Sequence, residues 1–589
     1  MSHHNEKDKL FGDVHIPLPI MFRRLFKYLK PEILRFVLSF LLILLTVAID
    51  IYIPLIIPQI IAEIRSVSPA LKFIIGLSVG YLLLGIFNQL ILYFESMILQ
   101  RAGQNIIYNL RMEVFSHIEK MSINQFNTMP VGSLVTRVAN YTSSLSDLFT
   151  NTLVNILRNV LTAIGVYIYM WVLSWQLSLI LLGFVVVIFA ASMIFSKNVH
   201  KLFKKERAII SDLNTFINEN VSGMKIIQIF NQEIRKEKEF LDKNETLRKC
   251  KYSVTIAFGL YRPFISLLNV AAIAVIFIMG VKLSLGLEGI LAFYLLISKF
   301  FNPIQHLADQ LNHITRAVTA SERLFNLLDV EPEVMDSPNA REIDSFKGKI
   351  EFRNVWFAYE EENWILKNVS FVVEPKQTVA FVGATGAGKT TILSLIVRNF
   401  EIQSGQILID DIDIKDIKIE SLRKAIGQML QDVFLFSGNI RNNITLHDDS
   451  YTDEQIKEVC DYVNASSFID LLPKGLDEEV VEKGENFSTG QRQLLSFART
   501  VLHKPQILIL DEATANIDTE TEVIIQESLD KIKNIGTMLV VAHRLSTIQH
   551  ADNIIVLQHG EVIESGNHQK LLKQKGHYYK LYQLQFENK

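Results

Sequence analysis

Cysteine is almost absent from this sequence, which contains only Cys250 and Cys460 among its 589 residues. Two cysteines so far apart exclude both a disulfide framework and a cysteine-rich zinc site. Neither sign of charge is in excess, since 59 Lys and Arg residues face 62 Asp and Glu residues. This near-neutral balance gives no electrostatic reason to expect nucleic acid as a partner.

Charge of either sign is also scarce. Only 21% of the residues are charged, whereas 49% are apolar, and the mean hydropathy is +0.23. Such a composition excludes a disordered chain. A soluble enzyme of this length rarely has a positive mean hydropathy, so we expect a membrane portion.

The apolar residues concentrate in the first half of the chain. A helix needs about 20 predominantly apolar residues to cross a bilayer. We predict six spans, over Phe36–Ala62, Leu71–Leu99, Leu153–Leu173, Leu177–Phe195, Val254–Met279 and Gly289–Phe301. Lys299 and Pro303 interrupt the sixth, which we expect to continue past Pro303. Beyond Leu328 no segment reaches spanning length.

The distribution of cations predicts the orientation. Lys and Arg cluster before the first span and between spans four and five, whereas the short loops after spans one, three and five hold few. The positive-inside rule therefore predicts that both termini and the two long loops are cytoplasmic. Residues Ile16–Glu32 mix apolar and basic side chains, as in an amphipathic helix on the inner membrane surface.

The two long loops have about 50 residues each, too many for simple turns. Apolar residues in them recur at helical spacing, which indicates extensions of the spanning helices into the cytoplasm. Each pair of extensions would be joined by a short crossing segment, near Asn127–Val131 and near Ser222–Ile226.

The second half of the chain has a different sequence pattern. Residues Glu331–Lys349 are polar and contain prolines without apolar periodicity, which is typical of a linker. From Ile350 onward, short β-rich runs alternate with helical patterns, as a parallel sheet requires. We therefore divide the chain into an N-terminal segment with an interfacial helix (1–34), a six-helix membrane domain (35–328), a linker (329–349) and an α/β domain (350–589).

The α/β domain contains a phosphate-binding motif near its start. It fits the pattern G-x-x-x-x-G-K-T and lies between a predicted strand, Thr378–Val382, and a predicted helix, Thr391–Arg398. Glycines let backbone N–H groups converge on phosphate oxygens, and the helix N-terminus adds its positive end. The motif consists of Gly383, Ala384, Thr385, Gly386, Ala387, Gly388, Lys389 and Thr390. Lys389 would reach the β- and γ-phosphates, and Thr390 would offer a hydroxyl to Mg²⁺.

A second motif joins the apolar strand Ile507–Leu510 to two carboxylates, Asp511 and Glu512. Ligands of open α/β sheets bind at the carboxyl ends of the strands. We expect Asp511 to orient Mg²⁺ and Glu512 to act as general base on the attacking water.

Further residues follow in a fixed order. After the phosphate loop the chain contains Gln431, the run Phe487–Gln491, Asp518 and His543, with the two carboxylates between. With these motifs the second half resembles the nucleotide-binding domain of ATP-binding cassette (ABC) transporters. The first half resembles the membrane domain of an ABC exporter half-transporter. The resemblance covers nearly the whole chain and implies an α-helical six-span transmembrane domain plus a cytoplasmic α/β P-loop nucleotide-binding domain with a helical subdomain.

The resemblance also implies ATP and Mg²⁺ as cofactors and assigns the site. The residues implied to bind the cofactors are Tyr359, Gly383, Ala384, Thr385, Gly386, Ala387, Gly388, Lys389, Thr390, Thr391, Gln431 and Asp511. Of these, Tyr359 would stack on adenine, and Thr390, Gln431 and Asp511 would serve the metal. The implied catalytic residues are Glu512 and His543. The residues implied to contact ATP on the opposite subunit are Ser488, Gly490, Gln491 and Asp518.

The family's usual signature, Leu-Ser-Gly-Gly-Gln, is altered here. Phe487 replaces the leucine and Thr489 replaces the first glycine, which adds a Cβ where backbone approaches phosphate. The change is either tolerated drift or the mark of a heterodimer with one weak ATP site, by analogy with heterodimeric bacterial multidrug exporters. In the second case the partner would lack the equivalent of Glu512.

Asp50 lies in the first predicted span, between Ile49 and Ile51. A carboxylate at such a depth costs about 2.5–3.5 kcal/mol on insertion scales, so it must face other helices or a wet cavity. Two interpretations stay open: a contact in the substrate pathway for a cation or a proton, and a structural hydrogen bond to a neighbouring span.

The sequence thus predicts ATP-driven export of amphiphilic, multidrug-type compounds by alternating access. The alternative is a lipid or glycolipid flippase of the same fold. A soluble ABC ATPase is disfavoured by the six spans, and an importer by the fusion of both domains. The expected partners are a second ABC half-transporter (a heterodimer favoured over a homodimer), the lipid bilayer and an amphiphilic small molecule. The expected location is a bacterial inner (plasma) membrane.

Overall fold

The computed structural model describes residues 14–67, 69–360, 363–429, 433–511, 519–541 and 548–583. Contacts divide the chain into two units. The residues up to Glu119 and Met129–Val330 form a helical unit, and Lys120–Thr128 joins the residues from Glu331 onward in an α/β unit.

Five long helices and several shorter ones build the described part of the helical unit. They are α2 (Leu18–Leu29), α3 (Ile33–Ile64), α4 (Leu71–Lys120), α6 (Val131–Thr136), α7 (Thr142–Asp147), α8 (Leu153–Leu173), α9 (Trp175–Ser222), α10 (Met224–Ile229), α11 (Glu233–Lys282) and α12 (Gly286–Leu328). The 3₁₀ turn η1 (Lys30–Glu32) joins α2 to α3, and the π-helical segments η2 (Arg137–Tyr141) and η3 (Leu148–Thr152) flank α7.

Several predicted features of these helices are confirmed. Helices α4, α9 and α11 extend far beyond their apolar stretches, as the helical spacing of the long loops predicted. Helix α12 continues through Pro303 without ending. The crossing segments differ in detail from the prediction: the first is α5 (Ile123–Thr128), which begins four residues before Asn127, and the second is α10, which begins after Gly223 ends α9.

Five helical stretches in the described part of the chain are long and apolar enough to cross a membrane. They are Leu18–Ile64, Leu71–Lys120, Val131–Leu173, Trp175–Ser222 and Glu233–Lys282. Helix α12, the predicted sixth span, is not among them, and the six-span count stays a prediction. Its Phe293, Leu296 and Ile297 are nevertheless fully buried in the apolar core of the helical unit.

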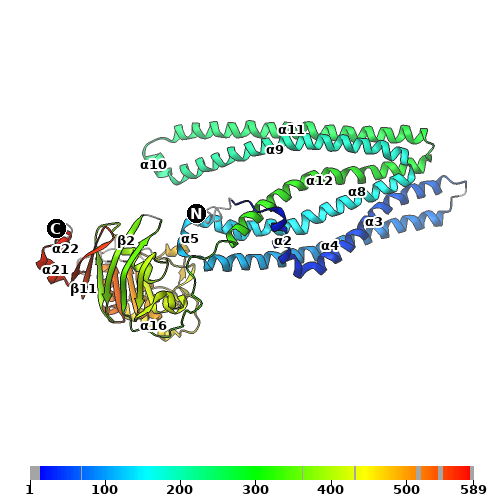
Figure 1. Ribbon diagram of the computed structural model, residues 1–589. Coiled ribbons are helices and arrows are strands. Elements are labelled where there is room, and N and C mark those ends of the chain that lie inside the picture. Colours follow the sequence, from blue (N-terminus) through cyan, green and yellow to red (C-terminus); the bar gives the residue numbers. More distant parts are fainter. Residues whose placement is uncertain are drawn as a thin grey trace. The chain divides into compact units, whose positions relative to one another are not determined.

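Helices α9 and α11 lie side by side along much of their length, joined by α10 (Figure 1). Aromatic side chains contribute to this pairing, since the rings of Phe195 and Tyr261 stack with centroids 3.9 Å apart. The Tyr261 hydroxyl also lies 2.7 Å from that of Ser192.

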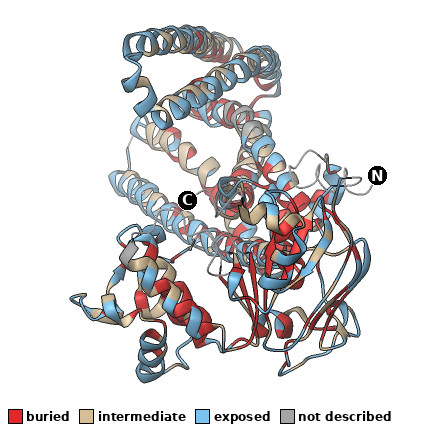
Figure 2. Ribbon diagram, turned by 90° about the vertical axis from the view of Figure 1, so that its left-hand side faces the viewer, coloured by how far each residue is buried: buried red, intermediate tan, exposed pale blue. Residues whose placement is uncertain are grey.

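Most residues along the long helices are exposed or of intermediate burial, as the pale blue and tan along them show (Figure 2). In the most apolar stretch of α4 only 11% of the residues are buried. Apolar surface of this extent in water would be unfavourable, so lipid or a partner chain has to cover it.

The α/β unit contains a central sheet of six strands in the order β12-β11-β3-β10-β9-β6. In chain order these are β3 (Thr378–Val382), β6 (Ile426–Met429), β9 (Ile507–Asp511), β10 (Thr537–Val541), β11 (Asn553–Gln558) and β12 (Glu561–Gly566). Strands β11, β3, β10, β9 and β6 run parallel, and β12 is antiparallel. The predicted α/β fold with a parallel sheet is confirmed.

A second, antiparallel sheet has the order β2-β1-β4-β5. Its strands are β1 (Ile350–Ala358), β2 (Trp364–Val373), β4 (Ser404–Ile409) and β5 (Ile412–Asp413), and a short pair joins β7 (Gly438–Asn439) to β8 (Glu479–Val480). The helices of this unit are α5, α13 (Lys389–Ile396), α14 (Ile419–Ala425), α15 (Ile440–Thr445), α16 (Asp453–Tyr462), α17 (Ser466–Ile469), α18 (Thr489–Leu502), α19 (Thr519–Ile532), α21 (His568–Gln574) and α22 (His577–Tyr582).

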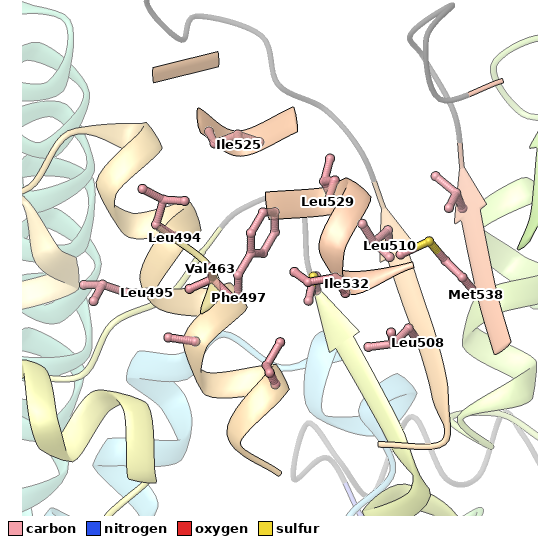
Figure 3. Close-up of a cluster of buried hydrophobic side chains, with 14 of the residues drawn as sticks. Val463, Leu494, Leu495, Phe497, Leu508, Leu510, Ile525, Leu529, Ile532 and Met538 are labelled. Carbon is pink, nitrogen blue, oxygen red and sulfur yellow. The ribbon is translucent and has the colours of Figure 1, made fainter. Parts of the chain in front are cut away.

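Both faces of the central sheet are buried, with side chains alternating between two cores. On β9, Leu508 and Leu510 enter the core shared with α18 and α19, whereas Ile507 and Ile509 enter the core shared with the antiparallel sheet. Figure 3 shows Leu508 and Leu510 pointing toward Phe497 of α18 and Ile532 of α19. Burial on both faces explains why β9 carries the unbroken apolar run Ile507–Leu510.

Candidate ATP site

The phosphate loop connects the fully buried strand β3 to helix α13. Gly388 precedes the helix with a φ of +101°, and a Cβ there would lie 2.6 Å from Leu366 Cδ2. A Cβ on Gly383 would lie 2.3 Å from the carbonyl oxygen of Leu557. Only glycine fits at these two positions, so the backbone path of the loop imposes the glycines of the motif.

Lys389 is buried at the start of α13, and its ammonium group lies over the loop. Its Nζ donates to the carbonyl oxygens of Gly383 at 2.9 Å and Ala384 at 3.1 Å. Burial lowers the pKa of Lys389 below its ordinary value, and the carboxylate of Asp511 opposes that shift. A cation held in this way, with little solvent around it, is suited to an anionic phosphate.

Asp511 ends strand β9 at the same edge of the sheet. The register pairs Asp511 with Val541 of β10, which in turn pairs with Phe381 of β3. Two strand spacings of about 4.8 Å place the Asp511 backbone roughly 10 Å from that of Phe381, just before the loop. The exposed hydroxyl of Thr390 lies in the first turn of α13. A hydroxyl and a carboxylate facing one phosphate loop are the hard oxygen donors that suit Mg²⁺.

Tyr359 follows strand β1 and reaches the same loop. Its hydroxyl lies 3.1 Å from that of Thr391, in the first turn of α13. The ring packs edge-to-face on Phe357 at 4.9 Å and on Phe400 at 5.1 Å between centroids, and the residue remains 45% exposed. An accessible ring fixed beside the phosphate loop fits the predicted stacking on adenine.

The signature residues occupy the N-terminus of α18. Ser488 Oγ accepts the backbone N–H of Gln491 at 3.2 Å, and the Gln491 side chain accepts the N–H of Ser488 at 2.9 Å. This reciprocal cap gives both residues a structural role. It leaves the Ser488 hydroxyl hydrogen free for a phosphate, at the positive end of a 14-residue helix whose second residue is the buried Gly490.

The two altered signature positions differ in their surroundings. Phe487 is buried in the core of the α/β unit, beside Phe468 at 6.3 Å between ring centroids. Its replacement of leucine is therefore a packing change. Thr489 is exposed, and its Oγ1 accepts from Arg492 at 3.3 Å. Of the two altered signature residues, only Thr489 is placed where it could affect how closely a phosphate approaches the helix.

Four predicted site residues lie outside the described residues: Gln431, Glu512, Asp518 and His543. Their roles stay predictions.

The membrane carboxylate has partners that the sequence reasoning missed. Asp50 Oδ1 on α3 lies 3.4 Å from Lys299 Nζ on α12 and accepts from Asn88 Nδ2 on α4 at 3.3 Å. The Asp50 and Lys299 side chains are 30% and 45% exposed. Lys299 is the one charged residue of the predicted sixth span, as Asp50 is of the first, and this was the signal that could have linked the two.

A second membrane ion pair was also missed. Glu95 on α4 is 1% exposed and accepts from Arg158 on α8. Both residues lie within segments predicted to span, where an unpaired charge would be costly. Their pairing holds α4 to α8.

Comparison with known proteins identifies the family. Residues 36–304 match the ABC transporter transmembrane region family, and residues 366–515 match the ABC transporter family. The "Probable multidrug resistance ABC transporter ATP-binding/permease protein YheH" of Bacillus subtilis is 37% identical over 86% of this chain and 76% of its own length. An ATP-dependent lipid A-core flippase of Syntrophus aciditrophicus is 33% identical over 84% of this chain and 83% of its own length.

A solved structure of a bacterial Atm1-family ABC exporter with ATP bound has a similar fold. Its TM-score is 0.78 at 26% identity, over 95% of this chain and 98% of that one. The expected fold, a helical transmembrane domain with an ABC nucleotide-binding α/β domain, is confirmed. The chain is a multi-pass membrane protein and an ABC ATPase coupled to transport. It belongs to the ABC transporters, as an exporter half-transporter with its membrane domain and ATP-binding cassette on one chain.

Proposed function

We propose that this half-transporter exports amphiphilic small molecules of the multidrug type across a bacterial cell membrane. The observation that carries the proposal is the Asp50–Lys299–Asn88 cluster, whose two charged side chains are partly exposed within predicted spans that are mostly apolar. A pathway with one polar cluster and apolar walls suits a substrate with a polar head and an apolar body. The relative named for multidrug resistance supports the same substrate class.

ATP binding drives the cycle through differential affinity. In the proposed dimer, ATP lies between the phosphate loop of one subunit and the Ser488 end of α18 from the other. It therefore binds the closed dimer more tightly than the open one, and closure follows from that difference. The membrane helices then alternate between inward-facing and outward-facing states.

Within its own site, each residue has a chemical task. Tyr359 stacks on the base, the residues from Gly383 to Thr391 hold the phosphates, and Lys389 neutralises their charge. Thr390, Gln431 and Asp511 would hold Mg²⁺, which supplies positive charge at the β- and γ-phosphates when bound. Glu512 takes a proton from the attacking water, and His543 contacts the γ-phosphate.

The dimer is asymmetric in this proposal. Thr489 places a Cβ at the start of α18, where Ser488, Gly490 and Gln491, together with Asp518, would face the partner's ATP. That site would close less tightly and hydrolyse slowly. The partner would accordingly lack a counterpart of Glu512, while the site built on this chain's phosphate loop would carry most of the hydrolysis.

The proposed orientation places both termini in the cytoplasm, with α2 on the inner membrane surface. The exposed apolar side chains of α2, which include Leu18, Ile20, Phe22 and Phe26, support that position because an interfacial helix buries such residues in lipid.

Lipid or glycolipid flipping is the second candidate function, and the relative named as a lipid A-core flippase favours it. An assay in vesicles separates the two. The native assembly, purified with whatever copurifies, is reconstituted and given ATP with either a cationic amphiphilic dye or a head-labelled phospholipid. We expect ATP-dependent accumulation of the dye and no change in lipid sidedness.

Two variants make the assay specific. Glu512→Gln should abolish ATP-dependent accumulation, whereas the exposed Glu458→Gln on α16 should leave it unchanged. Lipid movement without dye movement would favour the flippase, and accumulation that persists in Glu512→Gln would refute the assigned base.

A further inference from the structure

A cavity of about 290 Å³ lies within the helical unit. Side chains of α2, α3, α4, η3 and α8 line it. Ser39 is the one polar residue among the described residues that do so. An apolar cavity of this size does not hold water well and gains free energy from an apolar occupant.

The cavity is elongated along α3. Ile33, Phe36, Phe40 and Ile43 line it at helical spacings of three and four residues. Ten residues of helix correspond to about 15 Å of length. Phe26 and Leu29 of α2 line one end, so the cavity begins beside α2 and extends along α3 to Ile43.

Ser39 has the smallest side chain of the cavity lining. The residue is 1% exposed, and its Oγ has no hydrogen-bond partner among the described residues. A small side chain at this position leaves a void that the branched or aromatic residues common elsewhere on α3 would fill. A buried hydroxyl without a partner is unfavourable, so packing within the chain does not explain this serine.

Two cations stand near the α2 end of the cavity, at helical spacing from the lining residue Phe26. Arg23 and Lys30 are exposed and stand three residues before and four residues after Phe26, on one side of the turn. The nearby carboxylate of Glu32 is already compensated, because it accepts from Arg35 and from Asn105. The mouth is therefore positive at the level of lipid headgroups.

From this geometry we propose that the cavity binds one acyl chain of an anionic phospholipid from the cytoplasmic leaflet, with the phosphate beside Arg23 and Lys30. The site differs from the transport pathway at Asp50, and its assignment to a leaflet rests on the orientation proposed above. A lipid held between α2 and α3 would fill the void and fix the interfacial helix to the bundle.

Lipid retention tests the site. The purified native assembly is delipidated, incubated with phosphatidylglycerol or phosphatidylcholine, and analysed by native mass spectrometry. We expect wild type to retain phosphatidylglycerol in preference to phosphatidylcholine. Ser39→Phe fills the cavity and should lower retention about tenfold, since even two fewer buried methylene groups weaken binding by that order. The matched control Leu38→Phe alters a 46% exposed neighbour outside the lining and should retain the lipid.

Further variants keep the test decisive. Leu157→Phe fills the cavity from α8, in case Ser39→Phe fails to fold. Arg23→Gln with Lys30→Gln should remove the preference for phosphatidylglycerol, whereas Lys205→Gln on the extension of α9 should not. Equal retention by wild type and both filled variants would overturn the site, and equal retention of the two lipids would overturn the headgroup contact. Because no ATP is present, failure of the proposed transport would leave these results unaffected.

Discussion

Lys389 illustrates how a single residue links local backbone geometry to chemistry. The glycine-rich turn directs its ammonium group onto two loop carbonyls, 2.9 and 3.1 Å away. Burial lowers its pKa, so the group loses its proton at a lower pH than an exposed lysine. Phosphate binding favours the charged form and restores it.

Lys389→Ala should lower ATP hydrolysis by a factor of about 10² or more, because a buried positive donor aimed at the phosphates is lost. Lys457→Ala, which removes an exposed lysine from α16, is the matched control. Release of phosphate by the purified assembly measures the effect. Equal rates in the two variants would contradict the assignment of the phosphate loop.

At the same scale, Asp50 proved to belong to a cluster. Lys299 and Asn88 both lie within hydrogen-bonding range of its Oδ1, so the carboxylate is not an isolated site for a cation. The structural interpretation, a bond to a neighbouring span, thereby gains support. The pathway interpretation stays open because both charged side chains are partly exposed.

A double-mutant cycle separates these two interpretations. Asp50→Asn and Lys299→Gln should each lower the thermal midpoint of the reconstituted protein, and the double variant should lower it by less than their sum, with a coupling of about 0.5–3 kcal/mol. The charge exchange Asp50→Lys with Lys299→Asp preserves the ion pair but reverses which helix carries the carboxylate. If the exchange restores stability but not transport of the cationic dye, Asp50 contacts substrate. If it restores both, the pair is structural.

At the scale of elements, the N-terminus of α18 combines stability and function. The reciprocal cap between Ser488 and Gln491 satisfies backbone groups whether or not ATP is present. Ser488→Ala should therefore destabilise the α/β unit by about 1 kcal/mol. The same change removes a phosphate donor from the opposite site.

Thr489→Gly tests the asymmetry directly. If the Cβ hinders closure, the substitution should raise the rate of hydrolysis at the site completed by α18 several-fold, with little change in thermal stability. Phe487→Leu is the matched comparison, because Phe487 is buried in the core and should not affect the rate. Single-turnover hydrolysis by the native assembly measures both, and an unchanged rate in Thr489→Gly would indicate tolerated drift.

At the scale of the whole molecule, the proposed arrangement has one chain supplying half of each ATP site. The apolar faces of the long helices are also largely uncovered by the chain itself, as the 11% burial of the apolar stretch of α4 shows. The first feature requires a second subunit, the second is met by lipid or by a partner chain, and ABC half-transporters dimerise.

Tagging the chain in its native host and identifying what copurifies in mild detergent tests the proposed heterodimer. We expect a different ABC half-transporter in which the catalytic glutamate is substituted. Recovery of this chain alone would establish a homodimer, in which Phe487 and Thr489 are tolerated at both sites and both sites hydrolyse ATP.

The sequence by itself determined the two-part organisation, the parallel strands and the phosphate loop. All three follow from local patterns. The length of an apolar run predicts a membrane span, and a short apolar run predicts a central strand buried on both faces. Only glycine permits the backbone conformation at Gly383 and Gly388. The order of short motifs then placed the ATP site within a known family.

Only the tertiary structure decided which distant side chains meet. Lys299 is separated from Asp50 by 249 positions, and Arg158 from Glu95 by 63. Residues so far apart in the sequence form no local pattern that could predict their contact, because each pair forms only where separate helices pack. The cavity beside Ser39 has the same origin: a serine in an apolar helix is ordinary in sequence, and its empty surroundings exist only once α2, α3, α4 and α8 have assembled.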